Sequence, residues 1–539
     1  MLAQRQAPAA GRRGGHAGCN KGRRMRVLVA GDGAVAEATV SALLAQGHTV
    51  RLLSPDAESV VGRWPHGVEA SVGDVAASRH PQGTADGCQA VLHLGAVREP
   101  WATTAKTGAG SRASGPGRID VRGTRWLVGE AERAGAQRFV LLSSLRHERS
   151  PAEDGALMRE AEGIARGFRG VWSILRAGLV YAPGEGALAA LATMLRTMPA
   201  IPLVDGGQGV LQPLWHEDLG HALAQAAHLP AAAGRVLHVA GPERMTLSEV
   251  TDRLSGLVGR KPVRLPVPGL LASLGTETAA MLGVSLPGRA GALAELDGES
   301  RLPDSTLNAL TAVLGVTPTL LEDGLRKLVA RVPEQTPARG ADAIRRRRFS
   351  VDIEGSARKA RALRDLFRRS ATHVLRLEDG PPDGLLLKKG ALLSARVPLR
   401  GFVALRVVAI DPETITALTV EGDPLAGIVT FLFRDQRPGI RVEIVVEAGA
   451  TSLFDRVLAV TGGGALEDLD WPGAIERIVA LSGGRAPAGL QRDVKTLDDG
   501  EAETVRRRAE KLRMAHRRAS SRQKLAADLT TASYPSRDG

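Results

Sequence analysis

Residues 25–54, MRVLVAGDGAVAEATVSALLAQGHTVRLLS, decide the fold of the first part of this 539-residue chain. The apolar run 27–30 predicts a buried parallel strand. A helix follows, with apolar residues at helical spacing, and Gly47 predicts its end. The second apolar run, 50–53, predicts another strand. The stretch therefore predicts a β-turn-α-β unit.

The turn between this strand and this helix has the pattern G-x-G-x-x-A. It consists of Gly31, Asp32, Gly33, Ala34, Val35 and Ala36. Gly31 permits a tight turn, Gly33 lets a pyrophosphate approach the backbone, and Ala36 permits close helix–strand packing. The helix N-terminus adds free N–H groups that attract a phosphate. The pattern predicts a dinucleotide site; the alternative is a glycine-rich turn without a ligand.

Ser54 stands where such sites usually carry an acidic residue that binds the ribose 2′-hydroxyl. Without that carboxylate the site does not repel a 2′-phosphate. Arg51 and Arg63 are nearby cations, but the sequence does not place either on such a phosphate. We therefore expect NADP or NAD as the cofactor, with a slight preference for NADP.

The formal net charge of +13 lies in the two ends of the chain. Residues 1–24 contain six basic and no acidic residues, and residues 505–539 contain ten basic and three acidic residues. The body between them is neutral, so nucleic-acid binding is not expected.

The N-terminal region, 1–24, lacks the apolar segment of a secretory signal, and we interpret it as a basic disordered tail. Met25 is a candidate for the true start. No stretch has the length of a transmembrane helix. The cysteines, Cys19 and Cys88, fit a reducing compartment. We expect a cytoplasmic protein without a metal site.

Strand and helix patterns continue to alternate after residue 54. Strands are expected at 68–72, 90–94, 138–144 and 171–175, and a helix at 119–134. This alternation predicts an α/β fold with a Rossmann-type, doubly wound parallel sheet.

Several motifs together resemble the extended and atypical short-chain dehydrogenase/reductase superfamily, whose members include NAD(P)-dependent epimerases and dehydratases. They are VLHLGA (91–96), DVRGT (120–124), RFVLLSS (138–144), SILRAGLVYAPGEG (173–186) and VDGGQGVLQPLWHEDLGHAL (204–223). The chain is most similar to the branch of the NADPH-carrying accessory subunit of respiratory complex I. The resemblance implies an NAD(P)-binding domain over 25–332, with a small helical substrate subdomain over about 176–332.

The resemblance also implies which residues contact the nucleotide. Beyond the turn and Ser54, they are Asp74, Leu94, Gly95, Ala96 and Ser143.

The usual catalytic pair of this superfamily, Tyr-x-x-x-Lys, is missing. Asp154 and Met158 stand near its two positions. An ionised aspartate cannot donate a proton, and methionine carries no charge. The remaining candidates are Ser144, which matches the active-site serine, and Tyr181, which lies in a structural motif of the family. Two functions stay open: an oxidoreductase or epimerase with another acid/base, or a non-catalytic, nucleotide-binding redox sensor or assembly factor.

After a linker at 333–344, residues 345–484 alternate apolar and polar positions, as in GIRVEIVVEA (439–448). A helix is expected at 471–481. The segment resembles the helix-grip fold of polyketide-cyclase and START-like proteins, an α+β domain with an antiparallel sheet. That resemblance implies a cavity for a small apolar molecule, such as an isoprenoid; the alternative is a filled core. Residues 485–539 are expected to form a basic tail, helical or disordered.

Overall fold

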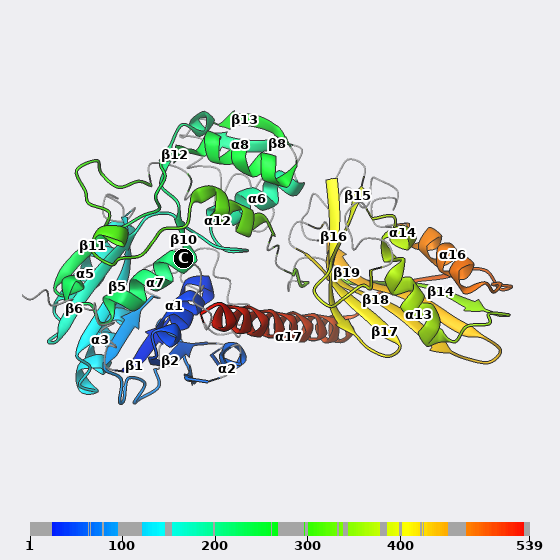
Figure 1. The fold of residues 1–539 in the computed structure, drawn as a ribbon, viewed down its shortest axis with the longest axis horizontal. Coiled ribbons are helices and arrows are strands. Elements are labelled where there is room, and N and C mark those ends of the chain that lie inside the picture. Colours follow the sequence, from blue (N-terminus) through cyan, green and yellow to red (C-terminus); the bar gives the residue numbers. More distant parts are fainter. Residues whose placement is uncertain are drawn as a thin grey trace, which may run out of the picture.

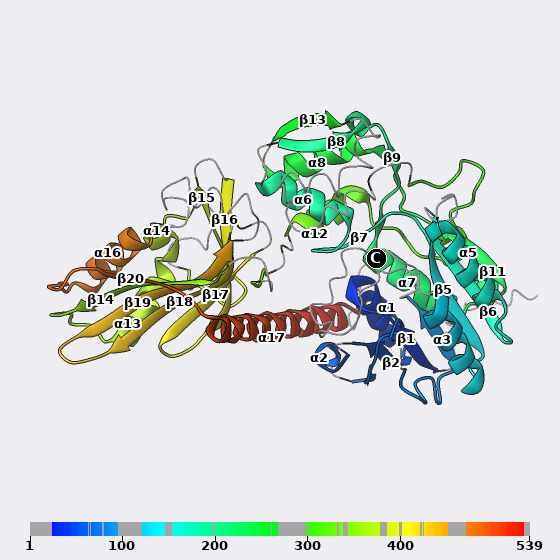
Figure 2. The same cartoon turned by 180° about the vertical axis from the view of Figure 1, so that it is seen from behind.

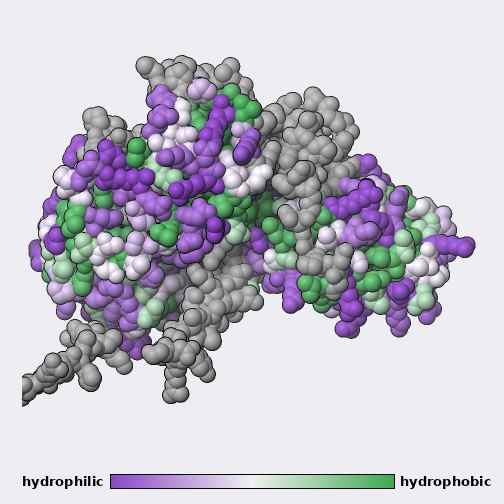
Figure 3. Space-filling model, turned by 45° about the horizontal axis from the view of Figure 1, so that its top comes forward, coloured by the Kyte–Doolittle hydropathy of each residue, from purple (hydrophilic) through white to green (hydrophobic). Residues whose placement is uncertain are grey.

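The computed structural model shows two domains (Figure 1). It describes residues 24–55, 57–62, 64, 66–77, 80–94, 121–145, 153–197, 200–259, 261–267, 296, 300–330, 332, 334–337, 343–377, 385–397, 401–420, 423, 425–450 and 470–532. The first domain is built on a parallel sheet and the second on an antiparallel sheet. Hydrophilic and hydrophobic residues are interspersed over the face drawn in Figure 3.

The parallel sheet has seven strands in the order β11-β6-β5-β4-β1-β2-β3. They are β1 (Arg26–Ala30), β2 (Thr49–Ser54), β3 (Val68–Val72), β4 (Ala90–His93), β5 (Arg138–Ser144), β6 (Val171–Ala177) and β11 (Arg235–Val239). Val27 pairs with Val50 of β2 on one side and with Ala90 of β4 on the other. The predicted Rossmann-type, doubly wound sheet is confirmed.

Helices cover both faces of this sheet. α1 (Gly33–Ala45) and α7 (His216–Ala226) pack on one face, while α3 (Val121–Arg133) and α5 (Glu153–Arg166) pack on the other. The short helix α2 (Ala57–Val61) lies beside β3. Alternate residues of β1 point to opposite faces, so Val27 and Val29 join one core and Leu28 the other.

The first turn of α7 lies in the interior of the domain. The helix begins at His216, and His216 and Asp218 are buried. Asp218 can be buried because its carboxylate accepts hydrogen bonds from the backbone N–H and the hydroxyl of Thr319. Gly220 allows close packing on α1, since a Cβ there would lie 2.6 Å from the Cβ of Ala38.

The segments that follow β6 and those that follow β11 together form a smaller lobe. Its strands form three two-stranded sheets: β10 (Leu214–Trp215) with β7 (Val180–Tyr181), β12 (Met245–Thr246) with β9 (Val210–Leu211), and β13 (Val263–Val267) with β8 (Ala200–Val204). Its helices are α6 (Ala187–Thr197), α8 (Leu247–Val258) and α12 (Leu321–Ala330), with the 3-10 turn η1 (Asp205–Gly207). The helix α11 (Ala309–Ala312) and the 3-10 turn η2 (Pro230–Ala232) instead pack on the core of the parallel sheet, beside β11.

The antiparallel sheet has the order β15-β16-β17-β18-β19-β14-β20. Its strands are β14 (Arg345–Ile353), β15 (Leu392–Val397), β16 (Gly401–Ile410), β17 (Thr414–Thr419), β18 (Leu425–Asp435), β19 (Ile440–Ala450) and β20 (Gln491–Thr496). The helices α13 (Ala360–Arg369), α14 (Ala371–Leu375) and α16 (Trp471–Ser482) pack on one face. The expected helix near 471–481 is therefore present; the assignment to the helix-grip fold stays a prediction.

The C-terminal helix α17 (Asp499–Ala532) covers the other face of the antiparallel sheet. Val505 and Ala509 pack with Val408, Leu418 and Ile428 of the sheet. From there α17 runs toward α1 and α2, as both Figure 1 and Figure 2 show. Within the part of the chain that the structure describes, no helix combines the length and the apolar composition of a membrane span.

The start of the predicted linker, 333–344, is held by the second domain. The carboxylate of Glu334 is buried and lies 2.9 Å from Nε of Arg406 and 3.6 Å from Nε2 of His516. The backbone N–H of Gln335 donates to the carbonyl of Thr419. Helix α6 of the smaller lobe also contacts β16. The first domain thus meets the second through this part of the linker and through α6.

Candidate functional site

The carboxyl ends of the central strands meet beside the glycine-rich turn. The N–H of Gly31 donates to the carbonyl of Leu53, and the N–H of Leu94 donates to that of Ala30. The carbonyl of Ser54 accepts from Gly73. The chain leaves β1 toward β2 on one side and reaches β4 on the other, so this edge is the topological switch point of the sheet. Open α/β sheets bind their ligands at this point.

The turn itself presents a backbone donor to a negative charge. Gly33 has φ +77°, a conformation that favours glycine, and α1 begins there. The N–H of Ala34 donates to Oε2 of Glu185 over 2.8 Å. A Cβ on Gly33 would lie 2.8 Å from the same oxygen. A carboxylate therefore lies against the first turn of α1, where the expected ligand is a phosphate.

Glu185 was not among the predicted site residues. It lies 151 residues from Ala34 in the sequence, in the loop between β7 and α6. No local pattern of the sequence connects the two segments. An acidic residue in the motif YAPGEG was the only available signal.

The other predicted residues of the turn occupy different environments. Asp32 is exposed and precedes α1 in an extended conformation, while Val35 is half-buried. Ala36 is buried in the core between α1 and the sheet, where its small side chain permits close packing. Gly95 and Ala96 lie outside the described residues.

The residues after β2 and β3 also border this edge. Ser54 ends β2 and is buried. Asp74 accepts a hydrogen bond from the N–H of Ala76, which holds the chain that leaves β3. Arg51 donates to the carbonyls of Gly83, Thr84 and Asp86, so its guanidinium holds that loop. Arg63 lies outside the described residues.

Ser143 joins a buried ionic cluster. Its hydroxyl donates to Oε1 of Glu162 over 2.7 Å. Two guanidinium groups, of Arg166 and Arg176, also donate to this carboxylate. Burial acts to raise the pKa of Glu162, but the bonds from Arg176 and Ser143 outweigh it and hold the pKa below its ordinary value. The charged carboxylate thus joins α5 to β6, and the expected contact between Ser143 and the cofactor stays a prediction.

The two catalytic candidates lie in different places. Ser144 is half-buried at the end of β5. Tyr181 is buried in the smaller lobe, with its ring 5.2 Å from that of Trp215 and its hydroxyl against Gly324 of α12. Burial raises the pKa of Tyr181, and the nearby carboxylates of Asp218 and Glu243 raise it further. This environment favours a packing role for the tyrosine.

The position expected for the catalytic lysine is part of the core. Met158 is 1% exposed and packs with Ala161. His93, at the end of β4, is also fully buried, and burial lowers its pKa to about 3. Its Nε2 lies 3.0 Å from the hydroxyl of Thr124. The ring is therefore neutral at pH 7 and cannot act as a cationic proton donor.

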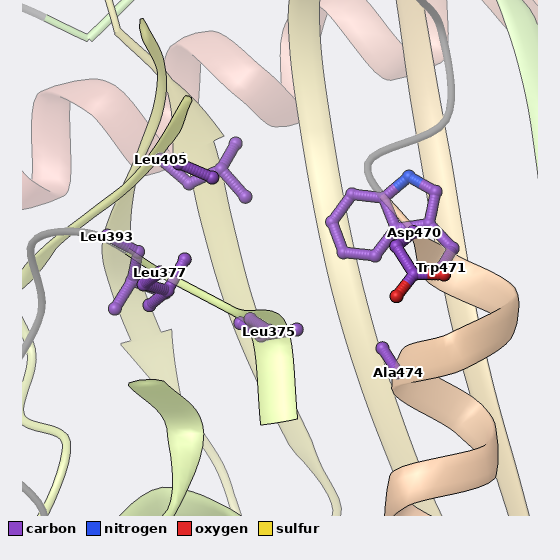
Figure 4. A pocket seen from close by; sticks show the side chains of 8 residues that line it. Leu375, Leu377, Leu393, Leu405, Asp470, Trp471 and Ala474 are labelled. Carbon is purple, nitrogen blue, oxygen red and sulfur yellow. The ribbon is translucent and has the colours of Figure 1, made fainter. Parts of the chain in front are cut away.

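The second domain contains a narrow apolar pocket (Figure 4). On one side lie Leu375, Leu377, Leu393 and Leu405, and on the other Trp471 and Ala474. Its free volume is about 10 Å³, which is space for about one water molecule. Beside it, the ring of Phe367 lies 5.2 Å from that of Phe431 and 5.5 Å from that of Phe433. This pocket is therefore too small for the expected ligand as it stands, and a larger cavity in this domain stays a prediction.

The sheet and its glycine-rich turn define an α/β protein with a Rossmann-type domain. Residues 31–169 match a family model described as NAD(P)H-binding, and the match begins at the first glycine of the turn. Among the described residues, no group of three or more His, Cys, Asp or Glu side chains has the arrangement of a metal site.

Comparison with known proteins finds one relative and several solved structures that each match part of this chain. A ceramide reductase of Caulobacter vibrioides is 26% identical over 209 residues, which are 38% of this chain and 62% of that protein. The chain thus spans less than two thirds of this relative. The crystal structure of the triphenylmethane reductase of Citrobacter, in complex with NADP(H), is 16% identical and has a TM-score of 0.42. The match covers 56% of this chain and 99% of the reductase. The crystal structure of the UDP-glucose 4-epimerase of Thermotoga maritima is 17% identical and has a TM-score of 0.41. The match covers 57% of this chain and 98% of the epimerase.

Proposed function

We propose that this protein binds NAD(P) at the turn 31–36 and uses it as a reductase of a small apolar, lipid-like or isoprenoid-like molecule. One observation supports the nucleotide site above all. The N–H of Ala34, at the first turn of α1, donates a hydrogen bond to a carboxylate oxygen. A pyrophosphate offers the same kind of acceptor. The match of residues 31–169 to an NAD(P)H-binding family supports the proposal.

The chain's own residues would divide the work of binding. The backbone of Gly33 and Ala34 would hold the pyrophosphate, and Ser54 would face the adenosine ribose at the end of β2. Because Ser54 carries no charge, a 2′-phosphate meets no repulsion there, and we expect a slight preference for NADP. The nicotinamide would supply the hydride.

Two observations support an apolar substrate. The curated relative is named a ceramide reductase, so its substrate is a lipid. The pocket of the second domain is lined mainly by leucines and Trp471. Since that pocket holds about one water molecule, α14 and α16 must move apart before an apolar ligand enters. A cytoplasmic location stays a prediction.

The second candidate is a non-catalytic redox sensor or assembly factor. The buried Met158, at the position of the usual lysine, favours it, because the pair that normally transfers the proton is missing. The resemblance to the accessory subunit of respiratory complex I points in the same direction.

The deciding experiment is a calorimetric titration of the full chain with NADPH and with NADH, followed by a single-turnover assay with a long-chain aliphatic ketone. Binding with turnover supports the reductase, and binding without turnover supports the sensor. Failure of both nucleotides to bind contradicts both candidates.

A matched pair of variants tests the role of Ser54. Ser54→Asp adds a carboxylate that can bind the 2′-hydroxyl and repel a 2′-phosphate, so the preference should shift toward NADH. Ser54→Ala removes the hydroxyl without adding charge and should leave the ratio of the two affinities nearly unchanged. An unchanged ratio in Ser54→Asp would mean that the ribose lies elsewhere.

A further inference from the structure

The carboxylate of Glu185 lies where the proposed ligand should place its phosphates. Its Oε2 accepts the hydrogen bond from Ala34. The same oxygen lies 2.8 Å from the position of a Cβ on Gly33, and Oε1 lies 3.6 Å from it. The space left by the missing side chain of Gly33 is therefore filled by a carboxylate from another part of the fold.

The loop that carries Glu185 is well defined. Ala182 and Glu185 exchange backbone hydrogen bonds of 3.3 and 3.1 Å. Gly184 and Gly186 both have positive φ, and α6 begins directly after them. A Cβ on Gly186 would lie 3.0 Å from the carbonyl of Val180, so the loop packs closely on β7. The backbone thus holds Glu185 opposite α1, and we expect its carboxylate to leave the turn by rotation of the side chain.

The carboxylate and a pyrophosphate cannot share this position. Both are anions, and both require the N–H groups at the first turn of α1. With Glu185 in place, a pyrophosphate would lack the Ala34 donor and would meet a like charge at contact distance.

We propose that Glu185 is a displaceable internal anion that competes with the dinucleotide for the glycine-rich turn, so that the free protein holds its own cofactor site closed. This inference rests on the proposed nucleotide site at residues 31–36. It adds that cofactor binding includes the cost of breaking the bond between Glu185 and Ala34.

Calorimetry on the full chain tests the proposal with three ligands: NADPH, ADP-ribose and adenosine. Glu185→Ala should bind NADPH and ADP-ribose about 10-fold to 100-fold more tightly than the unchanged protein, the range expected for one hydrogen bond to a charged group. Adenosine has no pyrophosphate, so its affinity should not change. Glu185→Gln keeps the shape but loses the charge and should lie between the two.

Glu58→Ala is the matched control, because Glu58 is an exposed acid at the start of α2 and its removal changes the net charge equally. Its affinities should equal those of the unchanged protein. Thermal unfolding of each variant checks that the fold is intact.

The possible outcomes separate the two levels of the argument. If the unchanged protein and Glu185→Ala bind NADPH equally well, the competition is wrong and the nucleotide site stands. If Glu185→Ala binds more weakly, Glu185 assists the cofactor, and the proposal is overturned. If no variant binds NADPH or ADP-ribose, the nucleotide site itself is wrong, and the competition is wrong with it.

Discussion

Arg176 of β6 and Glu162 of α5 form a buried two-point ion pair, with 2.8 Å from Nε to Oε1 and 2.7 Å from Nη2 to Oε2. Their side chains are 13% and 3% exposed. The hydroxyl of Ser143 completes the coordination of the carboxylate. A charge this deeply buried is stable only while its partners remain in place.

The pair predicts a stability that depends on pH. Because the folded pKa of Glu162 is lowered, its contribution is fully present above the ordinary glutamate pKa of about 4.3 and is lost as the pH falls through the folded value. We compare the unfolding free energy, measured with urea, at pH 7 and at pH 3. Between these two pH values it should fall less in Glu162→Gln than in the unchanged protein. Arg176→Met leaves the carboxylate uncompensated and should cost about 3–5 kcal/mol at pH 7. If the unfolding free energy of Glu162→Gln fell between pH 7 and pH 3 as much as that of the unchanged protein, the prediction for Glu162 would be wrong.

The turn predicts loss of nucleotide binding in Gly33→Val. The side chain would meet the carboxylate of Glu185 and fill the place of the pyrophosphate. Gly47→Val is the matched control, since Gly47 has φ +83° but no atom within 4 Å of its Cβ position. Both variants carry similar backbone strain, on the order of 1–3 kcal/mol. Calorimetry with NADPH should therefore show binding in Gly47→Val alone; equal affinities would remove the site from this turn.

Tyr181→Phe should leave any turnover with NADPH unchanged. The hydroxyl lies against Gly324 in the interior of the smaller lobe, and burial raises its pKa. Ser144→Ala is the comparison, because Ser144 ends β5 at the edge of the sheet where the cofactor is expected. Single-turnover rates measure both. A loss of about 100-fold or more in Tyr181→Phe, the scale of acid/base catalysis, would restore the tyrosine as the proton donor.

The aromatic cluster of the second domain predicts a large loss of stability in Phe367→Ala. This ring contacts those of Phe431 and Phe433 and is fully buried. Truncation should cost about 3–5 kcal/mol in urea unfolding, and Phe367→Leu distinctly less. If the interior were hollow, as in the ligand-binding alternative, the truncation would cost much less, because few contacts would be lost.

Local patterns of the sequence predict much of the first domain. The apolar run before Gly31, the helical spacing after it and the second run before Ser54 each require only neighbouring residues, and the structure has a strand, a helix and a strand there. The absence of the Tyr-x-x-x-Lys pair was likewise readable from the sequence, whereas the burial of Met158 was not.

β20 was not predicted, since QRDVKT has no apolar alternation; it is a strand because β14 offers an open edge. Other features depended on contacts between distant segments. The meeting of Glu185 with Ala34 and the burial of Asp218 by Thr319 join residues 151 and 101 positions apart. The sequence by itself determined the local units, because strand and helix periods are set by adjacent side chains. Only the tertiary structure decided which anion lies at the turn, because that depends on where the fold places the loop between β7 and α6 relative to the start of α1.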